Sequence, residues 1–144
     1  MEILVKAHSG LRWIVLILLI IAVVNAFMKK GKNSFTPGDK KIYLFTLIFV
    51  HLQLLIGIIL YFTSSRVTFE HMFANAATRF YGMEHTLGML IAITMITIGY
   101  SKSKKISEAN AKHTKISIFY LFALIIILLS IPWPFRQELG AGWF

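Results

Sequence analysis

The chain has 144 residues, of which 57% are hydrophobic and only 15% are charged. With a mean hydropathy of +0.71, this composition excludes an ordinary soluble globular domain and predicts an integral membrane protein. The net charge of +9 comes mainly from lysines in two short loops, where basic residues determine topology, so we expect no nucleic-acid partner. The lack of cysteine excludes disulfides, iron–sulfur clusters and covalent c-type haem attachment, which leaves histidine and methionine as soft ligands.

Four apolar segments follow one another along the chain, each close to the length of about 20 residues that crosses a bilayer. They extend over residues 8–28, 42–63, 81–100 and 114–131. The first is predicted to be a retained span, because it lacks the basic start and small-residue cleavage site of a signal peptide. The last stops at Pro132 and Pro134, since proline cannot continue a helix. The sequence therefore predicts an all-α fold, in which residues 1–144 form one transmembrane domain, an up-down-up-down four-helix bundle.

Lysine is concentrated in the first and third of the connecting loops. These lysines are Lys29, Lys30, Lys32, Lys40, Lys41, Lys102, Lys104, Lys105, Lys112 and Lys115. Because cytoplasmic loops carry the excess of Lys and Arg, we expect both termini to lie outside a bacterial cytoplasmic membrane. Trp13, Trp133 and Trp143 would then supply the aromatic belt at the outer interface.

The histidines within the apolar segments or at their rims indicate a function, because burying a polar ring in hydrocarbon is costly and such a ring usually has a role there. His8 lies at the outer rim of the first span and His85 near the outer end of the third, within roughly one helical turn of the same depth. Spans one and three stand diagonally across such a bundle, so the two rings can approach one macrocycle from opposite faces. We therefore expect one non-covalent haem b, with His8 and His85 as axial ligands of its iron.

His51 offers a second pairing. It lies near mid-membrane and could join His85 if span two tilts, because their depths differ by only about 10 Å. A hydrogen bond to the helix face of Gln53 or to a neighbouring span would satisfy His51 without any cofactor. Both interpretations stay open at this point.

The two remaining histidines are expected to be solvated. His113 lies between Lys112 and Lys115 at the inner rim, where a polar ring ordinarily reaches water. His71 lies in the outer loop. An alternative for this loop is a soft copper site, made from His71 with His85, Met72 and Met83.

Two ionisable residues accompany the outer histidines. Arg12 follows His8 by four positions and so shares its helix face, while Glu84 directly precedes His85. The Arg12 guanidinium could hold haem propionates, or it could form an ion pair with Glu84 across the bundle. Glu84 could also accept a proton beside a quinol site.

Small residues indicate where helices approach closely. Gly88, Ala92 and Gly99 recur at helical spacing on the third span, and Gly57 lies on the second. We expect these positions to allow close packing of backbones, with clearance for a flat ring as the second interpretation.

Several motifs spread over nearly the whole chain form a joint pattern. They are His8-Ser9-Gly10-Leu11-Arg12-Trp13, Glu84-His85, Gly99 before a lysine-rich loop, and Ile131-Pro132-Trp133-Pro134-Phe135-Arg136. In this pattern the chain resembles a family of small bacterial four-helix membrane proteins commonly labelled cytochrome b. The resemblance implies a b-type haem electron carrier or a respiratory-chain subunit, and it points to His8, Arg12, His51, Glu84 and His85. The layout is also similar to one half of haem A synthase, but the repeated histidine set of a two-haem enzyme is missing.

The sequence thus predicts a membrane protein that passes electrons between a quinol or enzyme partner and another redox centre. With almost no extramembrane mass, it is expected to work as a subunit of a larger membrane complex, without catalytic activity alone. The competing class is a haem-free accessory or assembly subunit, in which Arg12, Glu84 and the histidines only pair inside the bundle. A transporter or proton channel using His51 and Glu84 ranks last, because the spans show no broken helix.

Overall fold

The computed structural model describes residues 2–143, which contain helices and loops but no β-strand. Four helical segments are long and apolar enough to cross a membrane. They are α1 (Glu2–Lys29), α2 (Pro37–Thr63), the segment Ala76–Lys104 and α5 (Ala109–Ser130). The prediction of an all-α fold, with four helices long and apolar enough to cross a membrane, is confirmed for the described residues.

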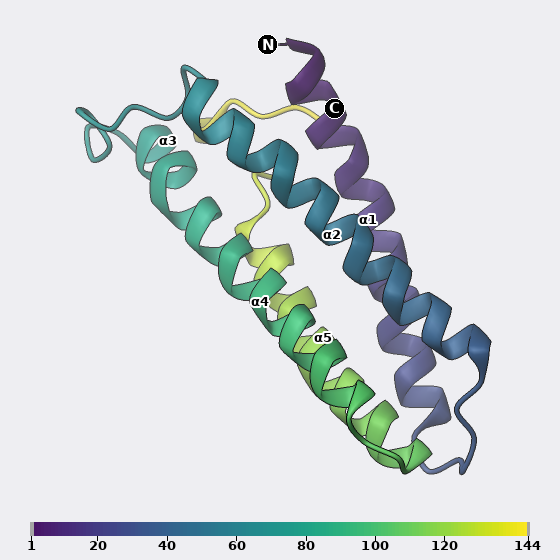
Figure 1. Cartoon of the computed structure of the whole chain (residues 1–144). Coiled ribbons are helices and arrows are strands. Elements are labelled where there is room, and N and C mark those ends of the chain that lie inside the picture. The colour runs from purple at the N-terminus through teal and green to yellow at the C-terminus, as the bar shows by residue number, and fades with distance from the viewer. Residues whose placement is uncertain (1, 144) are drawn as a thin grey trace.

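The helices lie side by side and run back and forth between the two ends of the molecule (Figure 1). Helix α1 packs against α2 and α5, and α4 (His85–Lys104) packs against α5 and α2. Consequently α1 and α4 face each other diagonally. The two chain ends lie at the same end of the molecule (Figure 1).

Helices α2 and α5 begin several residues before the corresponding apolar segments do, because polar caps extend them. Thr36 caps α2 in a capping box with Asp39, and Pro37 occupies the first turn. At α5, the Glu108 carboxylate accepts hydrogen bonds from the backbone N–H groups of Asn110 and Ala111. Such caps satisfy donors that a helix start leaves free, so the lysine-rich loops are short and the helices long.

The third crossing contains an irregular turn. After the short helix α3 (Ala76–Arg79), residues Phe80–Glu84 form a π-helical turn that leads directly into α4. The Thr86 hydroxyl donates to the Tyr81 carbonyl at 3.0 Å, five residues back. Nothing in the hydropathy pattern indicated this turn. Single π turns inside helices are rare and are frequent at functional sites, and this one immediately precedes His85.

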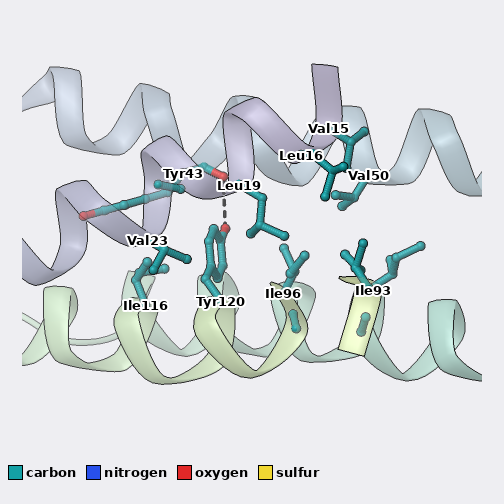
Figure 2. Close-up of a cluster of buried hydrophobic side chains, with 14 of the residues drawn as sticks. Val15, Leu16, Leu19, Val23, Tyr43, Val50, Ile93, Ile96, Ile116 and Tyr120 are labelled. Atoms are coloured by element: carbon teal, nitrogen blue, oxygen red, sulfur yellow. Dashed lines mark hydrogen bonds between the residues drawn. The ribbon is translucent and has the colours of Figure 1, made fainter. Parts of the chain in front are cut away.

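The buried core lies between the four long helices (Figure 2). Leu19, Tyr43, Ile96 and Tyr120 are completely buried, and the Tyr120 hydroxyl donates to the Tyr43 carbonyl at 3.0 Å. The outward faces are apolar as well, with large exposed side chains on every long helix. Examples are Ile17, Leu55, Leu90 and Leu129. Such a surface is suited to contact with lipid chains.

Candidate cofactor site between α1, α2 and α4

A cavity of about 480 Å³ lies at the end of the molecule that carries both termini. Its walls come from α1, α2, α4 and the last turn of α5, and part of the C-terminal segment, including Ala141 and Gly142, also lines it. The volume lies in the range of about 300–1,000 Å³ that is usual for cofactor-sized ligands. The lining is largely apolar, with a few polar side chains. These are His8, Ser9, Arg12, Gln53, Tyr61, Ser64, Arg66, Tyr81, His85 and Thr86.

The structure brings His8 of α1 and His85 of α4 together at this cavity. Their ring centroids are 6.3 Å apart, and the ring planes are inclined by 75°. Two imidazole nitrogens that each bind one metal ion at about 2 Å place their ring centroids about 6 Å apart. The spacing of the rings therefore fits two axial ligands of a single metal ion.

His85 is held by a backbone group of the neighbouring helix. Its Nδ1 donates to the carbonyl of Ser130, the last residue of α5, at 2.7 Å. This bond fixes the ring and leaves Nε2 as the lone-pair nitrogen, which is the arrangement found for metal-ligating histidines. Gly88 allows the close approach, because a Cβ at position 88 would collide with the Ser130 side chain. The predicted close packing at Gly88 is confirmed.

The His8 ring packs against Gly57 of α2. A Cβ at Gly57 of α2 would lie 3.3 Å from Cε1 of His8, so this glycine provides room for the histidine ring. The Gln53 side chain donates to the His8 carbonyl at 2.8 Å. These contacts tie the N-terminal part of α1 to α2 beside the cavity.

Three buried polar atoms at the cavity lack a hydrogen-bond partner among the described residues: His8 Nδ1, Arg12 Nε and Gln53 Oε1. Burying such an atom unpaired costs about 1–3 kcal/mol. Native proteins rarely leave several of these atoms around one space. A ligand that carries polar groups on an otherwise apolar body would satisfy these atoms.

Arg12 and Glu84 do not form the ion pair that the sequence allowed. The Arg12 side chain is buried and donates to the Trp143 carbonyl at 2.7 Å. Glu84 lies outside the cavity lining and forms an ion pair with Arg79 at 2.7 Å. Arg12 therefore faces the cavity without a carboxylate partner in the described chain, and Glu84 does not line a site to which it could pass protons.

His51 lies apart from the other two histidines. Its Nδ1 donates to the Leu47 carbonyl at 2.8 Å, and its Nε2 lies 3.4 Å from the Thr97 hydroxyl of α4. Thr97 follows His85 by twelve positions, which is about 18 Å along the helix. The alternative pairing of His51 with His85 is therefore not supported by the geometry. His51 is hydrogen-bonded to its own helix and contacts a neighbouring span, in line with the cofactor-free interpretation.

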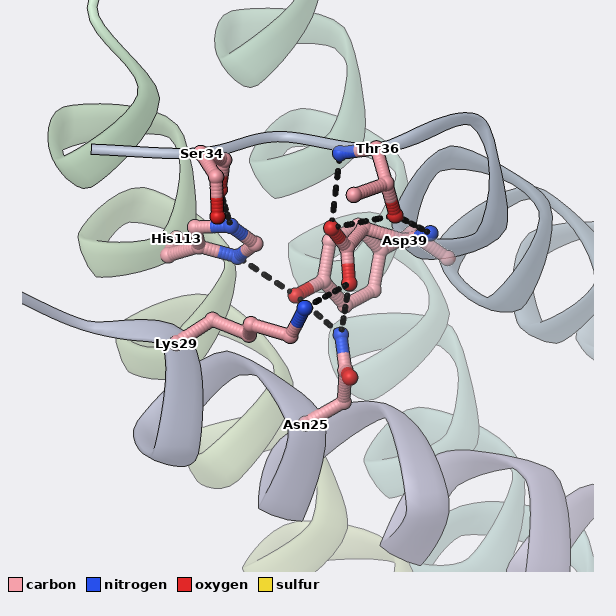
Figure 3. Close-up of polar contacts among 7 residues, drawn as sticks. Asn25, Lys29, Ser34, Thr36, Asp39 and His113 are labelled. Carbon is pink, nitrogen blue, oxygen red and sulfur yellow. Dashed lines mark hydrogen bonds and ion pairs between the residues drawn. The ribbon is translucent and has the colours of Figure 1, made fainter. Parts of the chain in front are cut away.

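His113 is buried, so the expectation that it is solvated is wrong (Figure 3). Its Nε2 donates to the Ser34 carbonyl at 3.1 Å, and its Nδ1 accepts from the Tyr43 hydroxyl at 2.8 Å. The loop before α2 folds over the ring, and the Phe35 ring lies 5.2 Å from it. His71 is exposed in the opposite loop, as expected.

Comparisons with known protein families, with curated proteins and with solved structures find no match to this chain.

Proposed function

We propose that this protein binds one haem b between His8 and His85 and carries electrons within a membrane. The main support for this proposal is that the imidazole rings of His8 and His85 lie at the cavity with their centroids 6.3 Å apart. A haem needs only two protein ligands, because the porphyrin supplies the other four. In the described part of the chain, no group of three or more His, Cys, Asp or Glu gathers in a metal-binding cluster. This donor set therefore suits the axial positions of a haem better than a bare ion.

The remaining cavity residues fit the other parts of a haem. The apolar walls suit the macrocycle. The Arg12 guanidinium, whose buried Nε has no hydrogen-bond partner among the described residues, suits a propionate, since Arg binds carboxylates in a bidentate way. When bound, the haem supplies one-electron redox chemistry. The chain contributes the ligands, the Ser130 carbonyl that orients His85 and a low-polarity setting that affects the redox potential.

We further propose an up-down-up-down crossing of the bacterial cytoplasmic membrane with both termini and the cavity at the outer side. The lysine-rich loops lie at the other end of the molecule (Figure 1), as the positive-inside rule requires of a cytoplasmic end. Trp13 packs against Trp133 and Trp143, with ring centroids 6.2 Å apart in each pair. These rings form a compact aromatic cluster at the outer interface.

The partner is expected to be a quinol or a redox subunit of a larger membrane complex. The four helices present apolar faces over most of their length, which can contact lipid or other membrane subunits. The resemblance to the family labelled cytochrome b points the same way.

A reduced-minus-oxidised absorption spectrum of the detergent-purified chain tests the proposal. After haem-replete expression we expect a sharp reduced α-band, and a pyridine haemochrome assay should give one haem b per chain. A colourless, folded protein from the same expression would contradict the proposal and favour a haem-free accessory or assembly subunit.

A further inference from the structure

A second hollow lies at the opposite end of the molecule from the cofactor cavity. Its volume is about 160 Å³, and it opens between the loop before α2 and the ends of α2, α4 and α5. Its lining residues are Phe35, Lys40, Tyr100, Ser103, Lys104 and Lys112. Three of these six are lysines, and each comes from a different helix.

The lysines of this hollow have no carboxylate partner in the described chain. Asp39 is buried and accepts from Asn25 and Thr36, and its one ion pair is with Lys29 at 3.8 Å. Figure 3 shows this closed network. Among residues 2–143, the only other carboxylate side chain at this end is that of Glu108, which caps α5. The charges of the three lysines are therefore left unbalanced around one space.

Aromatic rings hold two of the lysines at the hollow. The Lys112 ammonium lies 4.7 Å from the centre of the Phe35 ring, and that of Lys104 lies 6.0 Å from the Tyr100 ring. Such cation–π contacts restrict flexible stems. The Tyr100 hydroxyl has no hydrogen-bond partner within residues 2–143, so it can donate to a ligand. The hollow thus combines three cations with a free hydroxyl donor.

We propose that this hollow binds the phosphate of an anionic phospholipid head group. A water molecule occupies about 30 Å³ of liquid volume, so the space accommodates a phosphate with part of its ester. The hollow lies where the apolar helices end and the lysine-rich loops begin, which is the depth of lipid head groups. Basic pockets between transmembrane helices at the cytoplasmic side recognise such head groups. This proposal is independent of haem.

Native mass spectrometry on protein released from nanodiscs tests the inference. With phosphatidylglycerol in a phosphatidylcholine background, we expect the wild-type chain to retain phosphatidylglycerol selectively. The variant K40Q/K104Q/K112Q should retain it at least about tenfold less. The variant K40R/K104R/K112R should keep it, because the charges remain. The matched control K30Q/K32Q/K105Q removes the same charge from the same end outside the hollow and should resemble the wild type.

Equal loss of lipid in the hollow variant and the control would overturn the proposal, because it would show attraction to the surface charge as a whole. Equal retention of phosphatidylcholine and phosphatidylglycerol by the wild type would also overturn it. Displacement of the retained lipid by millimolar glycerol 3-phosphate would contradict a lipid source and identify a site for soluble phosphate esters. Circular dichroism of each variant confirms that the helices are intact.

Discussion

At the scale of single residues, the four histidines of the long helices divide into two kinds. Both ring nitrogens of His113 have hydrogen-bond partners, and His51 donates from Nδ1 to the Leu47 carbonyl and contacts the Thr97 hydroxyl through Nε2. His8 and His85 each keep a nitrogen without any hydrogen bond in the described chain, and their ring centroids lie 6.3 Å apart. Because buried polar groups ordinarily find partners, this difference separates structural histidines from candidate ligands.

The hydrogen bond between Tyr43 and His113 is predicted to stabilise the fold. Tyr43→Phe removes the donor to the buried Nδ1 of His113, so we expect unfolding free energy to fall by about 1–3 kcal/mol. Chemical unfolding in detergent, followed by circular dichroism, measures this loss. Tyr100→Phe is the matched control, because the Tyr100 hydroxyl has no partner in the described chain. A Tyr43→Phe variant as stable as the control would disprove a role for the bond.

The sequence predicted the position of a functional side chain only where spacing along one helix determines that position. The common depth of His8 and His85 follows from the helical rise and from where each span begins. The burial of His113 does not, since it depends on Ser34 and Phe35 folding back over the ring. Likewise, the partner of Arg12 is the carbonyl of Trp143, which lies 131 residues away. Local hydropathy does not predict contacts between segments that lie so far apart in the sequence.

At the scale of helices, the packing of α4 on α5 determines the position of His85. Gly88 lets Ser130 approach, and the Ser130 carbonyl accepts from His85. Hydropathy and small-residue spacing predicted this close contact. They could not predict the π turn before His85, because such turns are rare and hydropathy carries no information about which backbone groups are hydrogen-bonded.

Gly88→Ala is expected to disturb the site as well as the fold. A Cβ at position 88 would collide with the Ser130 side chain, and overpacking costs about 1–3 kcal/mol. We expect a lower thermal midpoint together with a reduced content of haem or an altered α-band. The readouts are thermal unfolding and the visible spectrum.

Two other glycines provide the controls for this prediction. A Cβ at Gly99 meets Phe119 on the same α4–α5 contact, eleven residues from Gly88, whereas a Cβ at Gly10 meets nothing. Gly99→Ala should lower stability without changing the spectrum of bound haem, and Gly10→Ala should change neither. If Gly88→Ala merely matched Gly99→Ala, α5 would have no part in orienting His85.

At the scale of the whole molecule, the two ends differ in chemistry. One end carries the termini, the tryptophans and the histidine-lined cavity, and the other carries the lysine-rich loops and the basic hollow. Four apolar segments in the sequence were sufficient to predict four helices long and apolar enough to cross a membrane. Their hydropathy could not show which faces meet, because the helices are apolar toward lipid and core alike.

The proposed topology predicts which loops are accessible from outside the cell. The sequence has no cysteine, so single substitutions at exposed loop positions report their location without background. Ser65→Cys, in the loop after α2, should react with a membrane-impermeant maleimide in intact cells, whereas Asn33→Cys, in the loop before α2, should react only after lysis. Gel-shift labelling measures both. The reverse pattern would place the termini and the cavity at the cytoplasmic side.

The haem content per chain of single histidine variants tests whether His8 and His85 are the axial ligands of the haem. His8→Ala and His85→Ala should each lose the low-spin spectrum and most of the haem. His51→Ala and His71→Ala should retain one haem b per chain, because His51 contacts Thr97 and His71 is solvated. Retention of the low-spin spectrum by both His8→Ala and His85→Ala, or its loss in His51→Ala alone, would contradict the account.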